Sequence, residues 1–388
     1  MSYRLHCYAK GLLECGAQLR VVTPRSKKSK EGKLFFFKDI FDGVKYKILF
    51  NRSFKGLNLV NYILKELDPF LLVLYCIINI RKYDIFWLIK FGVLANIMCI
   101  PILHLFGKKV VFEVNENPYS TVGSKLTRIR WINNLLRKLT FNWIYPQVDG
   151  FIVISENLRQ LILPCLKKNA LILKVPILID VEKKIKTSLN RSLPTKNPYL
   201  FHAGSLSTKK DGIIEVFKAY TKACSILGPN IKLDFVITNK VTLPHVWTEI
   251  QEVIRVNNLA DRIIVTGYLG DDEMDYMMKH ASVSVINKPV NDQNLYNFPT
   301  KIGEYLRCGV PIVIGAEKME LLEYLANYDN AIITSPNNVD GLRDGIVHIL
   351  QDVKLSKKLS KQGIITAKRQ FSYKIHGARL FKFFNKWI

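Results

Sequence analysis

The chain has 388 residues, enough for two domains of ordinary size, and its 48% hydrophobic and 23% charged residues indicate a globular protein. Its seven cysteines, an odd number without a C-x-x-C pair, indicate a reducing compartment and argue against a disulfide framework and a structural zinc site. The formal net charge of +25 makes the protein strongly basic.

The distribution of this charge narrows the class of partner. Residues 1–190 hold 31 Lys and Arg against 13 Asp and Glu, a net charge of +18, and the remainder carries +7. A basic half suits nucleic acid, anionic lipid or an acidic substrate. The sequence contains no nucleic-acid-binding motif, and long aliphatic and aromatic residues separate the basic ones. We therefore expect peripheral contact with an anionic membrane and no nucleic-acid partner, with a merely basic surface as the alternative.

Neither of the two most apolar segments predicts a membrane span. Residues 70–80 are too short, because a spanning helix needs about 20 residues. Residues 85–106 are long enough, but Lys90, Asn96 and Pro101 interrupt them, so we expect a strand over 85–89 followed by a buried helix. The first residues also lack the apolar core of a signal peptide. The sequence therefore predicts a cytoplasmic protein, with any membrane contact on the inner face of the cell membrane.

In the first half of the chain, predicted strands and helices alternate. This rhythm indicates a parallel sheet whose ligands lie at the carboxyl ends of the strands. Glu116, in the loop after the strand over 108–114, is a candidate functional carboxylate, and Glu113 is a weaker one. The alternatives are a solvated loop acid and a strand-edge acid. Before that strand, we expect a helix over 3–15, a strand over 18–24, a solvated basic loop over 25–55 and a helix over 58–80.

Residues 124–145 form a basic, amphipathic stretch that contains Trp131 and Trp143. Such a pattern is typical of helices that lie on anionic membrane surfaces. The alternative is a helix that packs by its aromatic side chains and leaves its basic residues in water. The strand predicted over 149–154 then ends at Ser155, which suits a helix N-cap.

A second domain begins at residue 198, after a linker over 179–197 that is rich in Lys, Ser and Asn. Residues 198–203 predict a strand that runs into a glycine turn, then into Lys209 and Lys210, and then into a helix. By itself, such a pair of lysines can also be a solvated part of the surface.

Residues 297–314 read NFPTKIGEYLRCGVPIVI. This pattern predicts a loop, a helix from Thr300 that ends in a glycine C-cap, and a buried strand from Pro311. Thr300 and Lys301 place free N–H groups at a helix N-terminus, which favours an anion such as a diphosphate. Glu304 lies one turn farther on, where a carboxylate can accept hydrogen bonds from sugar hydroxyls.

These motifs resemble those of the retaining GT-B glycosyltransferases of group 1, of the bacterial surface-polysaccharide type. Residues 297–314 are similar to the donor-site signature of that family, and residues 198–212 to its glycine–lysine element. The resemblance implies an α/β fold of two Rossmann-like domains that face a cleft. The N-terminal domain would comprise residues 1–178, with a C-terminal helix over 371–388 packing back on it, and the nucleotide-sugar-binding domain residues 198–370.

Members of the family begin with a strand and a glycine-rich loop, whereas this sequence starts directly at the first helix. We therefore expect the first strand of the N-terminal domain to be missing. Either the natural start lies upstream, or the chain is a truncated product with compromised activity.

The resemblance also implies the reaction, which is transfer of a sugar from a nucleoside-diphosphate sugar, with retention, to a glycan or lipid-linked acceptor in cell-surface polysaccharide synthesis. Lys210 and the helix N-terminus would neutralise the diphosphate, Glu304 would bind the ribose, and Glu116 would contact the acceptor. No metal or other cofactor is implied, since there is no Asp-x-Asp cluster. The implied substrate-binding residues are Gly204, Ser205, Lys209, Gly267, Tyr268, Tyr296, Phe298, Pro299, Thr300, Lys301 and Asn115.

Three positions depart from the commonest pattern of the family. Ser205 stands where many members have Arg, Asn115 where many have His, and Tyr296 where the first of two Glu residues usually lies. These departures keep two alternatives in view. One is a non-catalytic or truncated GT-B nucleotide-sugar-binding protein, and the other is a nucleotide-sugar epimerase.

Overall fold

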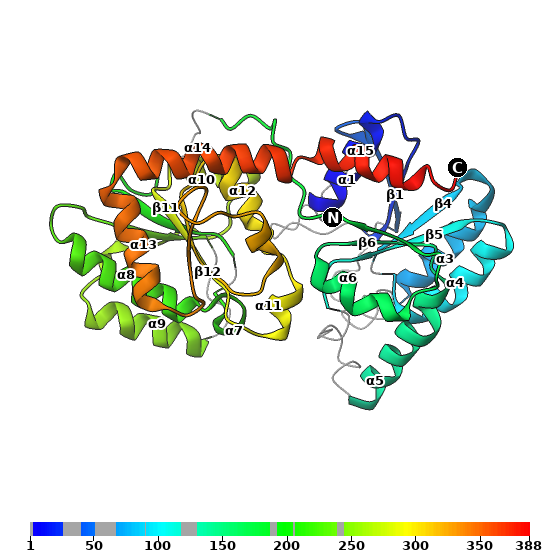
Figure 1. Ribbon diagram of the computed structural model, residues 1–388, viewed down its shortest axis with the longest axis horizontal. Coiled ribbons are helices and arrows are strands. Elements are labelled where there is room, and N and C mark those ends of the chain that lie inside the picture. Colours follow the sequence, from blue (N-terminus) through cyan, green and yellow to red (C-terminus); the bar gives the residue numbers. More distant parts are fainter. Residues whose placement is uncertain are drawn as a thin grey trace. The chain divides into compact units, whose positions relative to one another are not determined.

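The structure is a computed structural model that divides into two compact units (Figure 1). Unit 1 comprises residues 1–178 and 373–388, and unit 2 comprises residues 179–372. None of the helices that the structure describes is long and apolar enough to cross a membrane. The described residues are 3–25, 40–50, 67–89, 91–117, 130–186, 192–204, 206–238 and 244–388.

Unit 1 contains two sheets. Four parallel strands form one sheet in the order β4-β5-β6-β7, and the other has the order β1-β3-β2, with β1 parallel and β2 antiparallel to β3. β6 is fully buried, as expected for a strand of a covered parallel sheet. The strands are β1 (Val21–Arg25), β2 (Ile40–Phe41), β3 (Val44–Phe50), β4 (Ile85–Leu88), β5 (Lys109–Val114), β6 (Gly150–Val153) and β7 (Leu171–Lys174).

Helix α1 packs against both sheets of unit 1. Tyr8 joins the hydrophobic cluster of β5 and β6, whereas Ala9 joins that of β1 and β3. The helices of the unit are α1 (Tyr3–Glu14), α3 (Asp68–Ile78), α4 (Val93–Leu105), α5 (Arg130–Leu139), α6 (Glu156–Ile162) and α15 (Tyr373–Phe384), and single turns lie at Ile80–Lys82, Thr140–Ile144, Tyr145–Gln147 and Leu163–Cys165.

Two sequence predictions for unit 1 were wrong in part. The basic loop predicted over 25–55 contains β3, because Val44 and Tyr46 alternate with lysines and bury their side chains. The helix predicted to be buried after residue 89 is α4, which buries only one face. Leu94, Met98 and Leu105 on its other face are 60%, 48% and 83% exposed.

The C-terminal helix α15 packs on α1, although the two are far apart in sequence. Gly11 and Gly377 meet at this crossing: a Cβ on Gly11 would lie 2.9 Å from Gly377 Cα. The hydroxyl of Tyr373 on α15 also donates to the Glu14 carboxylate over 2.5 Å. Only glycines allow the two backbones to approach this closely.

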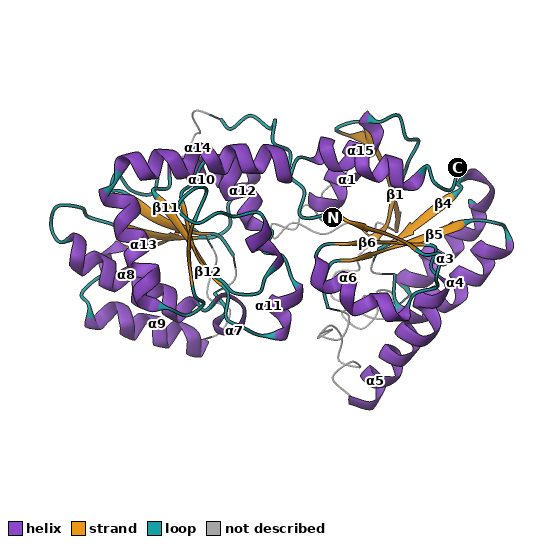
Figure 2. Cartoon of the chain, viewed as in Figure 1, coloured by secondary structure: helices purple, strands orange, loops and turns teal. Residues whose placement is uncertain are grey.

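Unit 2 holds one six-stranded parallel sheet, with the order β10-β9-β8-β11-β12-β13, whose strands lie between helices (Figure 2). Its strands are β8 (Tyr199–His202), β9 (Asp234–Ile237), β10 (Ile263–Val265), β11 (Val283–Asn287), β12 (Ile312–Gly315) and β13 (Ile332–Thr334). Its helices are α7 (Thr208–Asp211), α8 (Ile213–Leu227), α9 (Pro244–Val256), α10 (Asp271–His280), α11 (Asp292–Tyr296), α12 (Lys301–Cys308), α13 (Val339–Gln351) and α14 (Val353–Gln370), with single turns at Ala260–Arg262 and Glu320–Glu323.

Strand β8 shows how the two faces of this sheet are covered. Leu200 belongs to the hydrophobic core with α8, α9 and α13. Its neighbours point to the opposite face: the Tyr199 hydroxyl donates to the Met277 carbonyl of α10 over 2.6 Å, and the Phe201 ring meets the Tyr305 ring of α12. This alternation places α12 on the face opposite α8.

Asp149 joins several elements of unit 1. Its carboxylate accepts hydrogen bonds from Lys167 Nζ over 2.7 Å and from the Val110 amide over 2.8 Å, and His104 Nε2 lies 3.1 Å away. Burial alone would raise the pKa of Asp149. The hydrogen bonds from these groups stabilise its charged form more strongly, so the pKa lies below its usual range.

We expect Asp149→Asn to lower the free energy of unfolding of unit 1 by about 1.5–3 kcal/mol at neutral pH, because hydrogen bonds to a charged group are lost. A depressed folded-state pKa stabilises the protein above the unfolded pKa of about 4, and this stabilisation is lost as the pH falls through the folded value. The difference between wild type and variant should therefore be constant at neutral pH and should narrow below about pH 4.

Urea unfolding followed by tryptophan fluorescence measures this difference, since four of the five tryptophans lie in unit 1. Asp84→Asn is the matched control, because the Asp84 side chain is 75% exposed and its contact with Lys108 is 3.5 Å long. An equal loss of stability in both variants would contradict the role given to Asp149.

Candidate functional site

The direction of chain travel through the sheet of unit 2 reverses between β8 and β11. From β8 the chain moves outward to β9 and β10, and then returns to β11 and moves outward on the other side to β12 and β13. Ligands of open α/β sheets bind at the carboxyl ends of the strands that flank such a reversal. Two segments follow these ends directly, the turn over 204–212 and the loop over 288–300.

The turn after β8 carries the predicted anion-binding lysines. The Ser207 side chain caps the short helix α7 by accepting a hydrogen bond from the Lys210 amide over 3.1 Å. Gly212 ends the helix at φ +47°, and a side chain there would overlap Asn287. Lys209 is exposed and Lys210 is half-buried, while Gly204 lies just after the strand. Ser205 lies outside the described residues.

A buried ion pair fixes this turn to the end of β11. Lys288 Nζ lies 2.6 Å from the Asp211 carboxylate, and the two side chains are 7% and 12% exposed. The same ammonium group donates to the Lys210 carbonyl over 3.4 Å. Burial lowers the pKa of Lys288, and the nearby charge of Asp211 opposes this shift. Lys210 is thus held by a lysine 78 positions later in the chain.

Three asparagines complete the attachment. Asn287 donates to the Gly212 carbonyl over 3.1 Å, Asn291 to the Lys209 carbonyl over 2.8 Å, and Asn294 to the Lys210 carbonyl over 3.1 Å. Three carbonyls of the turn therefore have partners from the end of β11 and from the loop that follows it. Because these partners orient the carbonyls, the lysine side chains remain available to face a ligand.

The helix α12 begins at the N-cap Thr300, which is exposed. Lys301 Nζ lies 2.6 Å from the Glu304 carboxylate, and the two side chains are 37% and 22% exposed. These two predicted site residues therefore pair with each other. A ligand at this helix end would have to break this pair. An anionic group of the ligand would replace Glu304 as the partner of Lys301, and hydroxyl groups of the ligand would replace Lys301 as the partners of Glu304.

Tyr305, the residue after Glu304, connects α12 to the end of β8. Its hydroxyl oxygen accepts a hydrogen bond from the Ala203 amide over 2.8 Å. Burial raises the pKa of Tyr305 to about 12, so the hydroxyl is neutral at physiological pH. Sequence analysis did not identify this role. The only signal was a tyrosine on the buried face of a short helix.

The remaining predicted residues of unit 2 divide into two groups. Gly267, at φ +75°, and Tyr268, 72% exposed, follow β10 at the same edge of the sheet. Phe298 is 5% exposed and packs its ring against Tyr324 and Phe371. Its side chain therefore anchors the loop, and its role in substrate binding stays a prediction. Tyr296 and Pro299, on either side of this anchor, are half-buried.

The predicted acceptor-side residues follow β5 in unit 1. Asn115 is half-buried, and Glu116 is exposed. Glu113 is different, because its carboxylate binds Arg4 Nε over 2.9 Å and the Tyr8 hydroxyl over 3.1 Å, and only 4% of its side chain is exposed. Glu113 therefore secures α1 to β5, which corrects its interpretation as a candidate functional carboxylate.

The edge of unit 2 thus combines cationic side chains, a helix N-terminus and one carboxylate. The cations and the free N–H groups suit a diphosphate, and a carboxylate in the first turn suits sugar hydroxyls. Among the described residues, no group of three His, Cys, Asp or Glu side chains could hold a metal ion.

Part of the chain matches a known protein family. Residues 184–365 match the family model described as glycosyl transferases group 1. HepE from Anabaena, solved in complex with UDP, has 14% identity, and the similarity covers 89% of this chain and 87% of HepE with a TM-score of 0.64. A glycosyltransferase from Rickettsia africae has 12% identity, with 98% of this chain and 93% of that chain covered and a TM-score of 0.67. No curated protein matches the chain significantly.

A third structure, sucrose-phosphate synthase from Thermosynechococcus elongatus, has 14% identity, with 98% of this chain and 92% of that chain covered and a TM-score of 0.67. Residues 184–365 therefore resemble a group 1 glycosyltransferase domain, and the fold is the α/β GT-B fold with Rossmann-like units.

We expect Lys288→Met to destabilise unit 2 by about 3–5 kcal/mol, because it leaves Asp211 buried without its partner. The double variant Asp211→Asn/Lys288→Met should lose less, since it removes both charges. Thermal unfolding of the two variants and of Asp211→Asn completes a double-mutant cycle. If the double variant loses as much free energy of unfolding as the two single variants lose together, the ion pair has no coupling energy and does not hold the turn.

Proposed function

We propose that the protein transfers a sugar from a nucleoside-diphosphate sugar, with retention at the anomeric carbon, to a glycan or lipid-linked acceptor in cell-surface polysaccharide synthesis. The observation that carries the proposal is the attachment of the Lys210 turn to the end of β11, at the reversal of the sheet and within the group 1 domain. HepE, which was solved with UDP and with UDP-glucose, supports uridine diphosphate as the first nucleotide to test and a UDP-sugar as the first donor.

In this proposal, the bond between the anomeric carbon and the diphosphate oxygen breaks, and a bond from the anomeric carbon to the acceptor oxygen forms. Lys210 and the Thr300–Lys301 end of α12 stabilise the charge that develops on the leaving diphosphate. Glu304 exchanges its contact with Lys301 for the ribose hydroxyls. The backbone of Gly267 and Tyr268 faces the base. No metal is required, because cationic side chains and backbone N–H groups supply the compensating charge.

The acceptor side of the proposal rests on unit 1. Glu116, exposed after β5, contacts the acceptor hydroxyl, with Asn115 beside it. The proton of the acceptor hydroxyl leaves with the departing diphosphate or passes to Glu116. A diphosphate is already a good leaving group, so the two carboxylates of glycoside hydrolases are not needed.

Thermal shift with UDP, GDP, ADP, TDP and CMP tests the donor site. A ligand at a hundred times its dissociation constant stabilises the folded state by about 2.7 kcal/mol. We expect one diphosphate to stabilise the wild type, and expect Lys210→Ala and Glu304→Ala to abolish most of this effect. Lys232→Ala, which removes an exposed lysine outside the site, is the control and should behave as the wild type.

Measurement of turnover distinguishes the proposed glycosyltransferase from the two alternatives, an epimerase and a non-catalytic binding protein. Conversion of the donor sugar without any added acceptor would indicate an epimerase. Stabilisation by a diphosphate with neither transfer nor hydrolysis of its sugar would indicate a non-catalytic binding protein. If no nucleotide stabilises the folded protein, the donor site proposed here is wrong.

We further propose that unit 1 contacts an anionic membrane surface from the cytoplasmic side. On α5, Trp131 and Leu135 are 68% and 49% exposed, one helical turn apart, and Arg137 and Lys138 are exposed beside them. Helices α3 and α4 pack together, and α4 contacts the Thr140–Ile144 turn that follows α5. Both α3 and α4 expose large apolar side chains. These are Phe70, Leu74, Ile77 and Ile78 on α3 and Leu94, Met98 and Leu105 on α4.

Exposed apolar area of this extent on neighbouring helices is typical of an interaction surface, and flanking cations favour anionic lipid. Residues 125 and 128 of the predicted amphipathic stretch lie outside the described residues.

We expect Trp131→Ala/Leu135→Ala to weaken binding to phosphatidylglycerol-containing vesicles about tenfold or more, since each large apolar side chain contributes about 1.5–3 kcal/mol when it is fully buried. Sedimentation with vesicles measures this, and raising the salt concentration should weaken binding further. The control is Ile226→Ala/Val256→Ala, which removes apolar side chains of unit 2 that are 52% and 65% exposed. Equal binding by the wild type and both variants would exclude this surface.

A further inference from the structure

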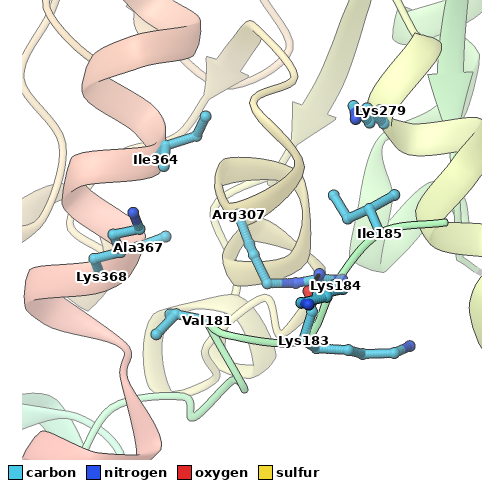
Figure 3. Close-up of a pocket in the computed structure, with 9 residues that line it drawn as sticks. All are labelled: Val181, Lys183, Lys184, Ile185, Lys279, Arg307, Ile364, Ala367 and Lys368. Atoms are coloured by element: carbon cyan, nitrogen blue, oxygen red, sulfur yellow. Dashed lines mark hydrogen bonds between the residues drawn. The ribbon is translucent and has the colours of Figure 1, made fainter. Parts of the chain in front are cut away.

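Unit 2 contains a basic cavity that the donor site does not include (Figure 3). Its volume is about 360 Å³, and its walls come from the segment over 181–185, the last turn of α10, the second half of α12 and the later part of α14. Five cationic side chains line it: Lys183, Lys184, Lys279, Arg307 and Lys368. None of them belongs to the groups assigned above to the diphosphate or the ribose.

The carboxylates next to this cavity are already paired. Asp275 contacts the Arg307 guanidinium and Lys183 Nζ, the latter over 2.8 Å. Asp272 pairs with Lys186 Nζ over 2.8 Å. Burial lowers the pKa of Lys183, but Asp275 outweighs this effect and the pKa lies above its usual range, so the ammonium group stays charged.

The other three cations of the cavity have no such partner. Within the described ranges, no carboxylate lies at ion-pair distance from Lys184, Lys279 or Lys368. Lys279 and Lys368 lie in the last turns of α10 and α14, where the helix dipole offsets only a fraction of a charge. The cavity therefore holds more positive than negative charge and attracts an anion.

The floor of the cavity is rigid. The Arg307 side chain is only 7% exposed, and besides its contact with Asp275 it donates to the Lys183 carbonyl over 3.2 Å. Arg307 thereby ties the 181–185 segment to α12 and α10. A ligand would meet a preformed surface and would lose little binding energy to ordering it.

We infer that this cavity binds a phosphate ester, either a soluble phosphorylated metabolite or the headgroup of a phospholipid. Lysine ammonium groups bind phosphate as point charges, and the aliphatic side chains of Ile364 and Ala367 on α14 can contact the carbon part of the ester. The volume suits a small ligand. The inference does not depend on the proposed function, because it uses neither the donor turn nor the acceptor loop.

The test is calorimetric titration of the full chain with glycerol 3-phosphate, which represents both sources, at a salt concentration of about 0.15 M to suppress non-specific contacts. We expect the exposed-lysine variant Lys184→Ala/Lys368→Ala to bind at least tenfold more weakly than the wild type. The charge-matched control Lys232→Ala/Lys354→Ala removes two exposed lysines away from the cavity and should bind as the wild type. Lys210→Ala should also leave this binding unchanged.

Three results would overturn the inference: no binding of glycerol 3-phosphate to the wild type, equal weakening in the charge-matched control, or loss of binding in Lys210→Ala, which would place the ester at the donor turn. Vesicles of phosphatidylcholine with phosphatidic acid separate the two sources. Weaker sedimentation of Lys184→Ala/Lys368→Ala than of its control identifies the lipid headgroup, whereas equal sedimentation with impaired titration identifies a soluble ester.

Discussion

The ion pair between Lys288 and Asp211 is the constraint on which the donor side of this protein depends. A lysine that is 7% exposed at the end of a parallel strand is tolerated only with a close counter-charge, and Asp211 supplies it from the turn after the neighbouring strand. The pair thereby fixes the distance between the two segments that flank the reversal of the sheet. The lysines of the turn acquire their position relative to the end of β11 from it.

Neutral polar side chains extend this constraint. Asn287 fills the space beside Gly212 and also accepts a hydrogen bond from the Asn337 amide, so the ends of three neighbouring loops share one buried side chain. Tyr305 likewise joins two elements, α12 and β8, through a hydrogen bond of its buried hydroxyl group. A buried polar network of this kind is stable only when each member is satisfied, which restricts the site to one arrangement.

Local sequence patterns correctly predicted the features that depend on residues close together in the chain. The Ser155 N-cap, the glycine C-cap after α12 and the alternation of strands and helices were all confirmed, because each follows from spacing within a few positions. β3 was missed although Val44 and Tyr46 alternate with lysines, since the charged residues around it dominated the pattern.

The attachments of the site could not be predicted in this way. Lys288 and Asp211 are 77 positions apart, and nothing near Lys288 in the sequence indicates that its side chain is buried. The packing of Phe298 and Glu113 was not predicted for the related reason that a motif shows which residue is present, and only packing shows where its side chain points.

The glycine contact between Gly11 and Gly377 determines the order in which the chain can fold. Unit 1 is completed by α15, which follows unit 2 in the sequence, whereas unit 2 is continuous in sequence. During translation, unit 2 can therefore fold while unit 1 still exposes the surface of α1 that α15 will cover. Unit 1 therefore reaches its final packing only after the whole of unit 2 has been synthesised, and until then the apolar face of α1 lacks its cover.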